Sequence, residues 1–239
     1  MKNGGRIEAA IQVLDDVMNR HQPVKSAMRD WGKRARYAGA KDRAWVSGLV
    51  LDALRHRNSL AYAMQSEAPR VLVLGALRHV WDWDMKDIES ALKDEHAPAP
   101  LTGEEREGIL LAPDPSAPLH VRGDFPEWLT PHLTRVFGED TVIETQEMSV
   151  RAPVDLRINT LKADPEKAGK AVKTAGGKPS DLLVNGYHIP APDPSQRETS
   201  LQSIPAYSKG WVEVQDAGSQ IAAAAGNAKP GDNVLDFCA

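Results

Sequence analysis

Apolar residues recur at spacings of three and four throughout the first part of this 239-residue chain. Ile7, Ile11 and Leu14 follow this period in a first segment, and a segment that begins near Asp42 repeats it. Such spacing places apolar side chains on one face of a helix, whereas a half-buried strand alternates strictly. The pattern therefore predicts an all-α domain over residues 1–95.

Proline marks the next part of the chain. Two proline-rich runs, 97–100 and 112–118, bracket one short segment in which Thr102 and Glu105 match a helix capping box. Proline breaks helices and stiffens connectors. Residues 96–125 are therefore predicted to be a proline-rich connector with a short helix.

Residues 126–210 mix the two periods and are predicted to form a small α+β module. Residues 153–160 alternate as a strand does, and a helical segment begins near Asp164. The Asn-Gly pair at 185–186 separates two short apolar runs, which favours a tight hairpin between them.

The last stretch, 211–239, starts with an alternating run, continues in an alanine-rich helical segment and reaches the apolar run Val234 to Cys238. An apolar strand after a Pro-Gly-Asp turn is typical of the first strand of an open parallel sheet, which binds ligands at the carboxyl ends of its strands. Any core strand has the same pattern, so this run by itself leaves both interpretations open.

The net charge of −4 hides an asymmetry. Residues 1–60 hold 12 Lys and Arg against 6 Asp and Glu, a net charge of +6, so the remaining 179 residues hold 17 against 27, a net charge of −10. The densest basic stretch interleaves its cations with Trp31 and Tyr37. Cations neutralise phosphates and exposed aromatic rings stack on bases, which favours RNA binding here. The candidate residues are Arg29, Lys33, Arg34 and Arg36. The alternative is a solvated helix face with both aromatic rings in the core.

Several classes of protein do not fit the composition. No apolar run approaches the roughly 20 residues of a membrane-spanning helix, and the N-terminus lacks the apolar core of a signal peptide. We therefore expect a cytoplasmic protein without a membrane partner. The single cysteine rules out an internal disulfide, and the histidines lack metal-ligand spacing, so no metal is expected.

Three segments resemble the RsmB (Sun/Fmu) family of RNA cytosine-5 methyltransferases. The segment 213–239 is similar to the family's VQDEGSQ helix and the VLDxCA loop that follows it; it reads EVQDAGSQIAAAAGNAKPGDNVLDFCA. The segment 39–64 resembles the family's NusB-like helical domain and reads GAKDRAWVSGLVLDALRHRNSLAYAM. The segment 151–163 resembles the family's small RRM-like module and reads RAPVDLRINTLKA. The segments come in the family's order, and the resemblance spans essentially the whole chain.

The resemblance implies a multidomain α and α+β chain. An all-α NusB-like domain over 1–95 precedes the connector and the RRM-like module, and residues 211–239 supply the first strand of a truncated Rossmann-like methyltransferase domain. It also implies RNA as the partner, ribosomal RNA in particular, and S-adenosylmethionine as the cofactor. The cofactor loop corresponds to Cys238 and Ala239.

Other candidate RNA contacts have alternative roles. Arg43 either binds phosphate or pairs with a neighbouring acid such as Asp42 or Asp52. Arg157 and Asn159 either contact RNA or help to fold the small module.

The chemistry of the family constrains what this chain does. Methylation of carbon 5 requires a cysteine thiolate that adds to carbon 6 of the pyrimidine, and the family places that cysteine far downstream of VLDxCA. Cys238 corresponds to the cofactor loop instead. The resemblance therefore implies a fragment, the RNA-recognition part of an enzyme, that is inactive by itself. The alternatives are a non-catalytic NusB-like RNA-binding module and a dinucleotide-dependent oxidoreductase, and the helical front end argues against the oxidoreductase.

Overall fold

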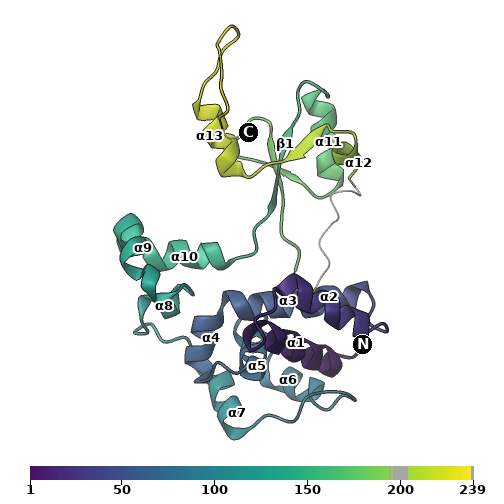
Figure 1. Cartoon of the computed structure of the whole chain (residues 1–239), viewed down its shortest axis with the longest axis vertical. Helices are drawn as coiled ribbons and strands as arrows, with labels where there is room; N and C mark the ends of the chain where they lie inside the picture. Colours follow the sequence, from purple (N-terminus) through teal and green to yellow (C-terminus); the bar gives the residue numbers. More distant parts are fainter. Residues whose placement is uncertain (194, 196–203, 238–239) are drawn as a thin grey trace. The chain divides into compact units, whose positions relative to one another are not determined.

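The computed structural model describes residues 1–193, 195 and 204–237. They form two compact units, the first made of Met1–Val150 and the second of Arg151–Pro192 together with the residues from 204 onward. Figure 1 shows helices in the first unit and a small sheet with helices in the second. The predicted combination of an α part and an α+β part is confirmed.

The regular secondary structure of the first unit, over the residues described, is all helical. The helices are α1 (Asn3–Met18), α2 (Val24–Arg34), α3 (Ala40–Arg55), α4 (Arg57–Met64), α5 (Pro69–His79), α6 (Met85–Ala91), α7 (Gly103–Leu110), α8 (Leu119–Arg122), α9 (Thr130–Phe137) and α10 (Thr141–Ser149), with short 3-10 helices at Glu127–Leu129 and Gly138–Asp140. Helix α5 packs against α1, α3, α4 and α7. Residues 72–77 of α5 are all buried, as expected for a helix that is surrounded by others.

The proline-rich stretch packs on the helical bundle. The guanidinium of Arg70 on α5 donates to both carboxylate oxygens of Glu105 on α7, at 2.7 and 3.0 Å. A Cβ on Gly108 would lie 3.0 Å from the backbone of Met64, so α7 and α4 are in close contact. The expected boundaries at 95 and 125 therefore do not coincide with the division between units, which falls at 150. Proline ends a helix whether or not the following chain packs against it, so composition could not locate the division.

The second unit contains a four-stranded antiparallel sheet in the order β2-β3-β1-β4. Its elements are β1 (Val154–Ile158), β2 (Lys178–Pro179), β3 (Gly186–Ile189) and β4 (Val212–Val214), with helices α11 (Pro165–Thr174), α12 (Pro205–Ser208) and α13 (Ala217–Ala225). In β1, Leu156 lies opposite Tyr187 of β3 and opposite Val214 of β4. The core between the sheet and α11 contains Leu156, Ile158, Val172 and Val212, all buried.

Two strands differ from the expectation. The alternating run that starts at Trp211 supplies β4 and so completes the sheet of the small module, rather than opening a further domain. The apolar run 182–184 forms no strand. Lys178 of β2 pairs with His188 of β3 instead, which makes the turn wider than the predicted Asn-Gly hairpin.

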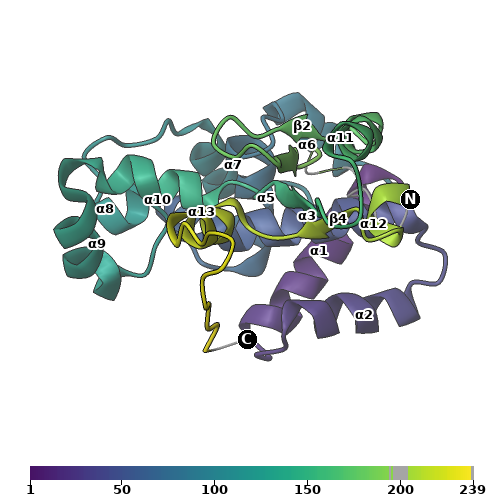
Figure 2. The ribbon, with the colours of Figure 1, turned by 90° about the horizontal axis from the view of Figure 1, so that it is seen from above.

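The run expected to be the first strand of a Rossmann-like sheet is not a strand. Residues 232–236 have no regular secondary structure, and Val234, Leu235 and Phe237 are 74%, 82% and 89% exposed. A parallel strand is buried on both faces by its neighbours, and no described strand lies beside this run. Figure 1 shows the segment after α13 as a long loop that runs out from the helix and turns back, and Figure 2 shows the same loop from above.

Candidate nucleic-acid interface

Helix α2 presents an apolar face to the core and a basic face to solvent. Ala27 and Trp31 are buried. Lys25, Arg29 and Lys33, spaced four residues apart, are exposed. Since four residues make slightly more than one helical turn, these three cations form a stripe along the helix, and Lys33 stands in its last turn.

The structure separates the two aromatic residues of the basic stretch. Trp31 is only 3% exposed and belongs to the core of the first unit. Tyr37, in the loop after α2, is 76% exposed. A ring that stacks on a base must be accessible, so in this stretch only Tyr37 can do so.

The exposed cations have weak or no acidic partners. Asp30 lies 3.2 Å from the ammonium of Lys33 and 3.5 Å from the guanidinium of Arg29. The hydrogen bond from Lys33 is the main cause that lowers the pKa of Asp30 below its usual value. Arg34 lies 3.5 Å from Asp16. Exposed pairs such as those of Asp30 contribute little to stability, and phosphates can replace this acid, whereas Asp16 is buried and also pairs with Arg20.

Arg36 differs from these neighbours. It is exposed and makes no ion pair or side-chain hydrogen bond within the part of the chain that the structure describes. Its charge is therefore available to an anion without the loss of an existing contact.

Arg43 holds the loop that carries Arg36 and Tyr37. Its guanidinium donates to the carbonyl of Gly32 at 2.8 Å and to the carbonyl of Ala38 at 3.1 Å. A Cβ on Gly32 would overlap this guanidinium, so glycine is what allows the close approach. A cation at the C-terminal end of a helix is also favoured by the helix dipole. Arg43 thus joins the end of α2 to the loop through hydrogen bonds to backbone carbonyls, and a phosphate contact by Arg43 stays a prediction.

Asp42 fixes the other end of the same loop. Its carboxylate accepts hydrogen bonds from the amide of Gly39 at 3.0 Å, from Arg6 Nε at 2.9 Å and from the N-terminal amine at 3.0 Å. Burial opposes ionisation, but these hydrogen bonds outweigh it and lower the pKa of Asp42 below its usual value. Asp42 and Arg43 therefore hold both ends of the basic loop by hydrogen bonds to its backbone.

In the second unit, Arg157 and Asn159 come together on one acid. Arg157 Nη2 lies 3.1 Å from Glu213 Oε2, and Asn159 Nδ2 donates to Glu213 Oε1 at 3.0 Å. Glu213 belongs to β4, so these contacts link β1 to its edge neighbour. They favour the module-building role, and an RNA contact by Arg157 or Asn159 stays a prediction.

The Gln-Asp-Ala-Gly-Ser-Gln segment fastens α13 to the sheet. The side chain of Asp155 on β1 accepts from the amide of Ala217 at 2.9 Å, and the buried Gln220 donates to the carbonyl of Gln215 at 2.7 Å. Ala217 takes part through its backbone, so alanine can replace the family's glutamate without loss of this bond. The predicted cofactor residues Cys238 and Ala239 lie outside the described residues.

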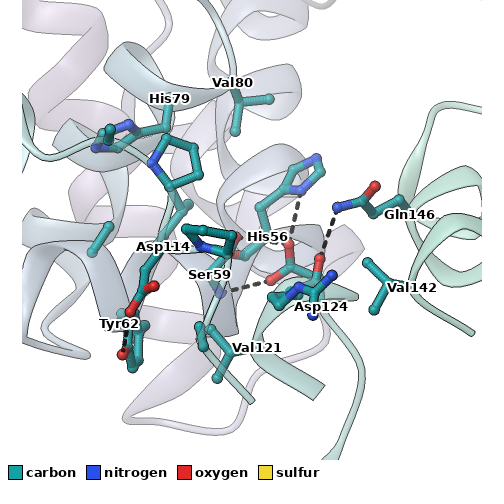
Figure 3. Close-up of a pocket in the computed structure, with 18 of the residues that line it drawn as sticks. His56, Ser59, Tyr62, His79, Val80, Asp114, Val121, Asp124, Val142 and Gln146 are labelled. Carbon is teal, nitrogen blue, oxygen red and sulfur yellow. Dashed lines mark hydrogen bonds and ion pairs between the residues drawn. The ribbon is translucent and has the colours of Figure 1, made fainter. Parts of the chain in front are cut away.

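A groove of about 1360 Å³ lies between α4, α8 and α10 (Figure 3). At its wall, Asp124 accepts hydrogen bonds from Ser59 N at 2.8 Å and Ser59 Oγ at 2.7 Å and lies 3.2 Å from His56 Nδ1. A serine nucleophile needs its hydroxyl bonded to an imidazole, whereas this hydroxyl contacts Asp124 and the His56 carbonyl. Asp124 instead caps the start of α4, although it lies 65 positions after Ser59 in the sequence. No local sequence pattern indicates this capping role.

Other classes of site were sought in the described residues. Among them, no group of three or more His, Cys, Asp or Glu is placed to hold a metal ion. In the same residues, every helix is too short or too polar to cross a membrane.

Sequence comparison links the chain to one group of curated proteins. A protein named ribosomal RNA small subunit methyltransferase B from Pseudomonas syringae pv. tomato is 28% identical over 140 residues, which are 59% of this chain and 30% of that protein. Proteins of the same name from Enterobacter sp. (strain 638) and Escherichia coli O1:K1 are 28% and 29% identical over 116 and 117 residues, each match covering 48% of this chain and 26% of the relative. The matches thus span less than a third of each relative's length. No protein-family model matches the chain.

Structure comparison supports the arrangement of the elements. The crystal structure of PH0851 matches 97% of this chain and 57% of that chain, with a TM-score of 0.51 and 15% identity. At that identity the match shows a shared fold alone.

Proposed function

We propose that the chain is a member of the ribosomal RNA small subunit methyltransferase B family, the name its sequence relatives carry, and that its helical unit recognises RNA for a cytosine-5 methyltransferase. In this proposal the first unit is the counterpart of the NusB-like domain and the second of the RRM-like module. The RNA is small-subunit ribosomal RNA, the molecule in the relatives' name, and S-adenosylmethionine is the methyl donor.

The basic face of α2 carries the proposal. Lys25, Arg29 and Lys33 run along one side of the helix, and the following loop adds Arg36 and Tyr37, both exposed. Phosphate contacts supply most of the affinity in nucleic-acid binding, and an exposed ring adds stacking on unpaired bases. Trp31 anchors the helix in the core, so the stripe is presented on a fixed support.

Methyl transfer itself is not assigned to the described residues. Val234, Leu235 and Phe237 are exposed and belong to no strand, so they do not form a cradle for the cofactor. The chain's one cysteine, Cys238, matches the cofactor loop of the family rather than its nucleophile. We therefore infer that residues 1–239 bind RNA without transferring a methyl group, and we derive no catalytic step from them.

Salt dependence tests the electrostatic part of this proposal. If about four phosphates are engaged, the logarithm of the RNA-binding constant should fall with the logarithm of salt concentration with a slope of roughly −3 to −4. Filter binding of a small-subunit ribosomal RNA transcript at salt concentrations between about 50 and 200 mM measures this slope. An affinity that does not change across this range would refute electrostatic recognition by this surface.

A further inference from the structure

Three lysines of the second unit converge on Trp211. The ammonium groups of Lys167, in α11, and Lys209, just after α12, each lie 4.7 Å from the centre of the Trp211 ring. Lys162, in the loop after β1, reaches the adjacent Gly210, where a Cβ would lie 3.3 Å from its ammonium nitrogen. Two segments far apart in the sequence, 162–167 and 209–211, therefore bring these positive charges to one place.

The charges of this lysine cluster, Lys162, Lys167 and Lys209, are not balanced by acids. All three side chains are exposed, and none makes an ion pair or a side-chain hydrogen bond to a residue that the structure describes. The neighbouring acids are engaged elsewhere. Glu166 pairs with Lys170 at 2.8 Å, and the side chain of Asp164 caps α11 by accepting from the amide of Lys167.

Such a cluster is unfavourable unless something compensates it. Lys167 and Lys209 are held by the same ring, so their ammonium groups lie within twice 4.7 Å of each other. At physiological salt the screening length is about 8 Å, so the two charges repel each other over this distance. The cation–π contacts position the lysines but do not cancel their charge. An anion bound beside both ammonium groups would do so.

The exposure of the three lysines indicates the kind of anion. Gly210 has a positive φ of 67° and no side chain, which lets the Lys162 side chain lie against the backbone beside Trp211. The ammonium groups are exposed rather than enclosed, whereas a site for a small anion needs a concave pocket that buries it. A polyanion gains from several such contacts at once, because each neutralised phosphate releases counterions.

We propose that Lys162, Lys167 and Lys209 form a second phosphate-binding site, which holds the backbone of an RNA strand beside Trp211. This inference rests on the proposed function and extends it to the second unit. It differs from the predicted contacts at Arg157 and Asn159, whose polar groups are engaged by Glu213.

Lysine footprinting tests the site. The whole chain is acetylated with limiting reagent, with and without an unmodified small-subunit ribosomal RNA transcript, and the reactivity of each lysine is measured by mass spectrometry. RNA should protect Lys162, Lys167 and Lys209. The matched controls are Lys170, Lys173 and Lys178, which are exposed lysines of the same unit outside the cluster and should stay reactive.

Substitutions give a second readout. Replacement of the three cluster lysines by glutamine should weaken RNA binding and reduce the magnitude of the log–log salt slope by about 2. The same replacement at Lys170, Lys173 and Lys178 should leave the slope unchanged. Replacement of the cluster by arginine should retain it, since the positive charges remain. If the glutamine variant does not fold, footprinting of the unsubstituted chain decides whether the lysine cluster binds RNA.

The outcomes separate this inference from the proposed function. RNA that protects Lys25 and Lys33 of α2 but leaves the lysine cluster reactive would overturn the second site and leave the proposed function standing. A chain that does not bind the transcript at all would contradict both. Equal salt slopes for the cluster and control glutamine variants, both folded, would also overturn the second site.

Discussion

Reversal of Lys33, Arg34 and Arg36 to glutamate should lower the affinity of the chain for small-subunit ribosomal RNA by roughly 100-fold. A charged contact at an exposed site contributes about 1 kcal/mol, and the loss of three such contacts corresponds to this factor. The new carboxylates also repel phosphates. Filter binding at about 0.15 M salt, where the screening length is still about 8 Å, measures the effect.

The matched control reverses three exposed or half-exposed cations elsewhere in the first unit, Arg78 on α5, Lys86 on α6 and Lys93 just after α6. Both variants change the net charge equally, so any effect of overall charge is shared. The control should bind RNA nearly as well as the unsubstituted chain. If both variants lose the same affinity, RNA senses the total charge and the basic face of α2 is not the interface.

Replacement of Glu105 by glutamine should destabilise the first unit by about 3 kcal/mol, because it leaves the guanidinium of Arg70 without its acid. Glu105 is 5% exposed and forms a capping box with Thr102. Glutamine can still fill the capping position, so the loss reports mainly on the ion pair. Urea unfolding at pH 7 measures it. Glu107→Gln, on the exposed side of the same helix, is the control and should change stability little.

The stabilisation by Glu105 should also depend on pH. Burial raises its pKa, but the hydrogen bonds from Arg70 and from the amide of Thr102 outweigh burial and lower the pKa below its usual value. A carboxyl whose pKa is lower in the folded state stabilises fully above its unfolded value of about 4.3 and progressively less as the pH falls through the folded value. The stability difference between the unsubstituted chain and Glu105→Gln should therefore shrink in acid. A difference that is the same at pH 7 and in acid would contradict the ion-pair account.

The helical and mixed parts of the fold could be predicted because their apolar residues repeat with a clear period. The boundary at 150 could not, because the contacts that attach α7 to the bundle, such as Arg70 with Glu105, join residues 35 positions apart. The strand expected from Val234 to Cys238 is absent over the described residues 234–237 for a related reason. A buried strand is defined by its neighbours, and an apolar run does not show whether neighbours are present.

The sequence predicted which basic residues make up the candidate site but not how their side chains are arranged. The basic stretch was identified, but helical spacing alone did not show that Trp31 is buried while Tyr37 lies in an exposed loop. The roles of Arg43 and Asp124 depend on backbone groups that the sequence pattern does not indicate. The lysine cluster around Trp211 was missed altogether because Lys209 and Trp211 are far in the sequence from Lys162 and Lys167.

The central claim is that the basic face of α2 recognises RNA for methyl transfer. Its most direct test is transfer of a radiolabelled methyl group to undermodified small-subunit ribosomal RNA by a protein extended through the whole reading frame. We expect transfer by this protein, a large loss when Lys33, Arg34 and Arg36 are reversed to glutamate, and none by residues 1–239 alone. Undiminished transfer by the reversed variant, or transfer by residues 1–239, would contradict the account. Inactivity of a folded full-length protein would instead favour a non-catalytic RNA-binding module.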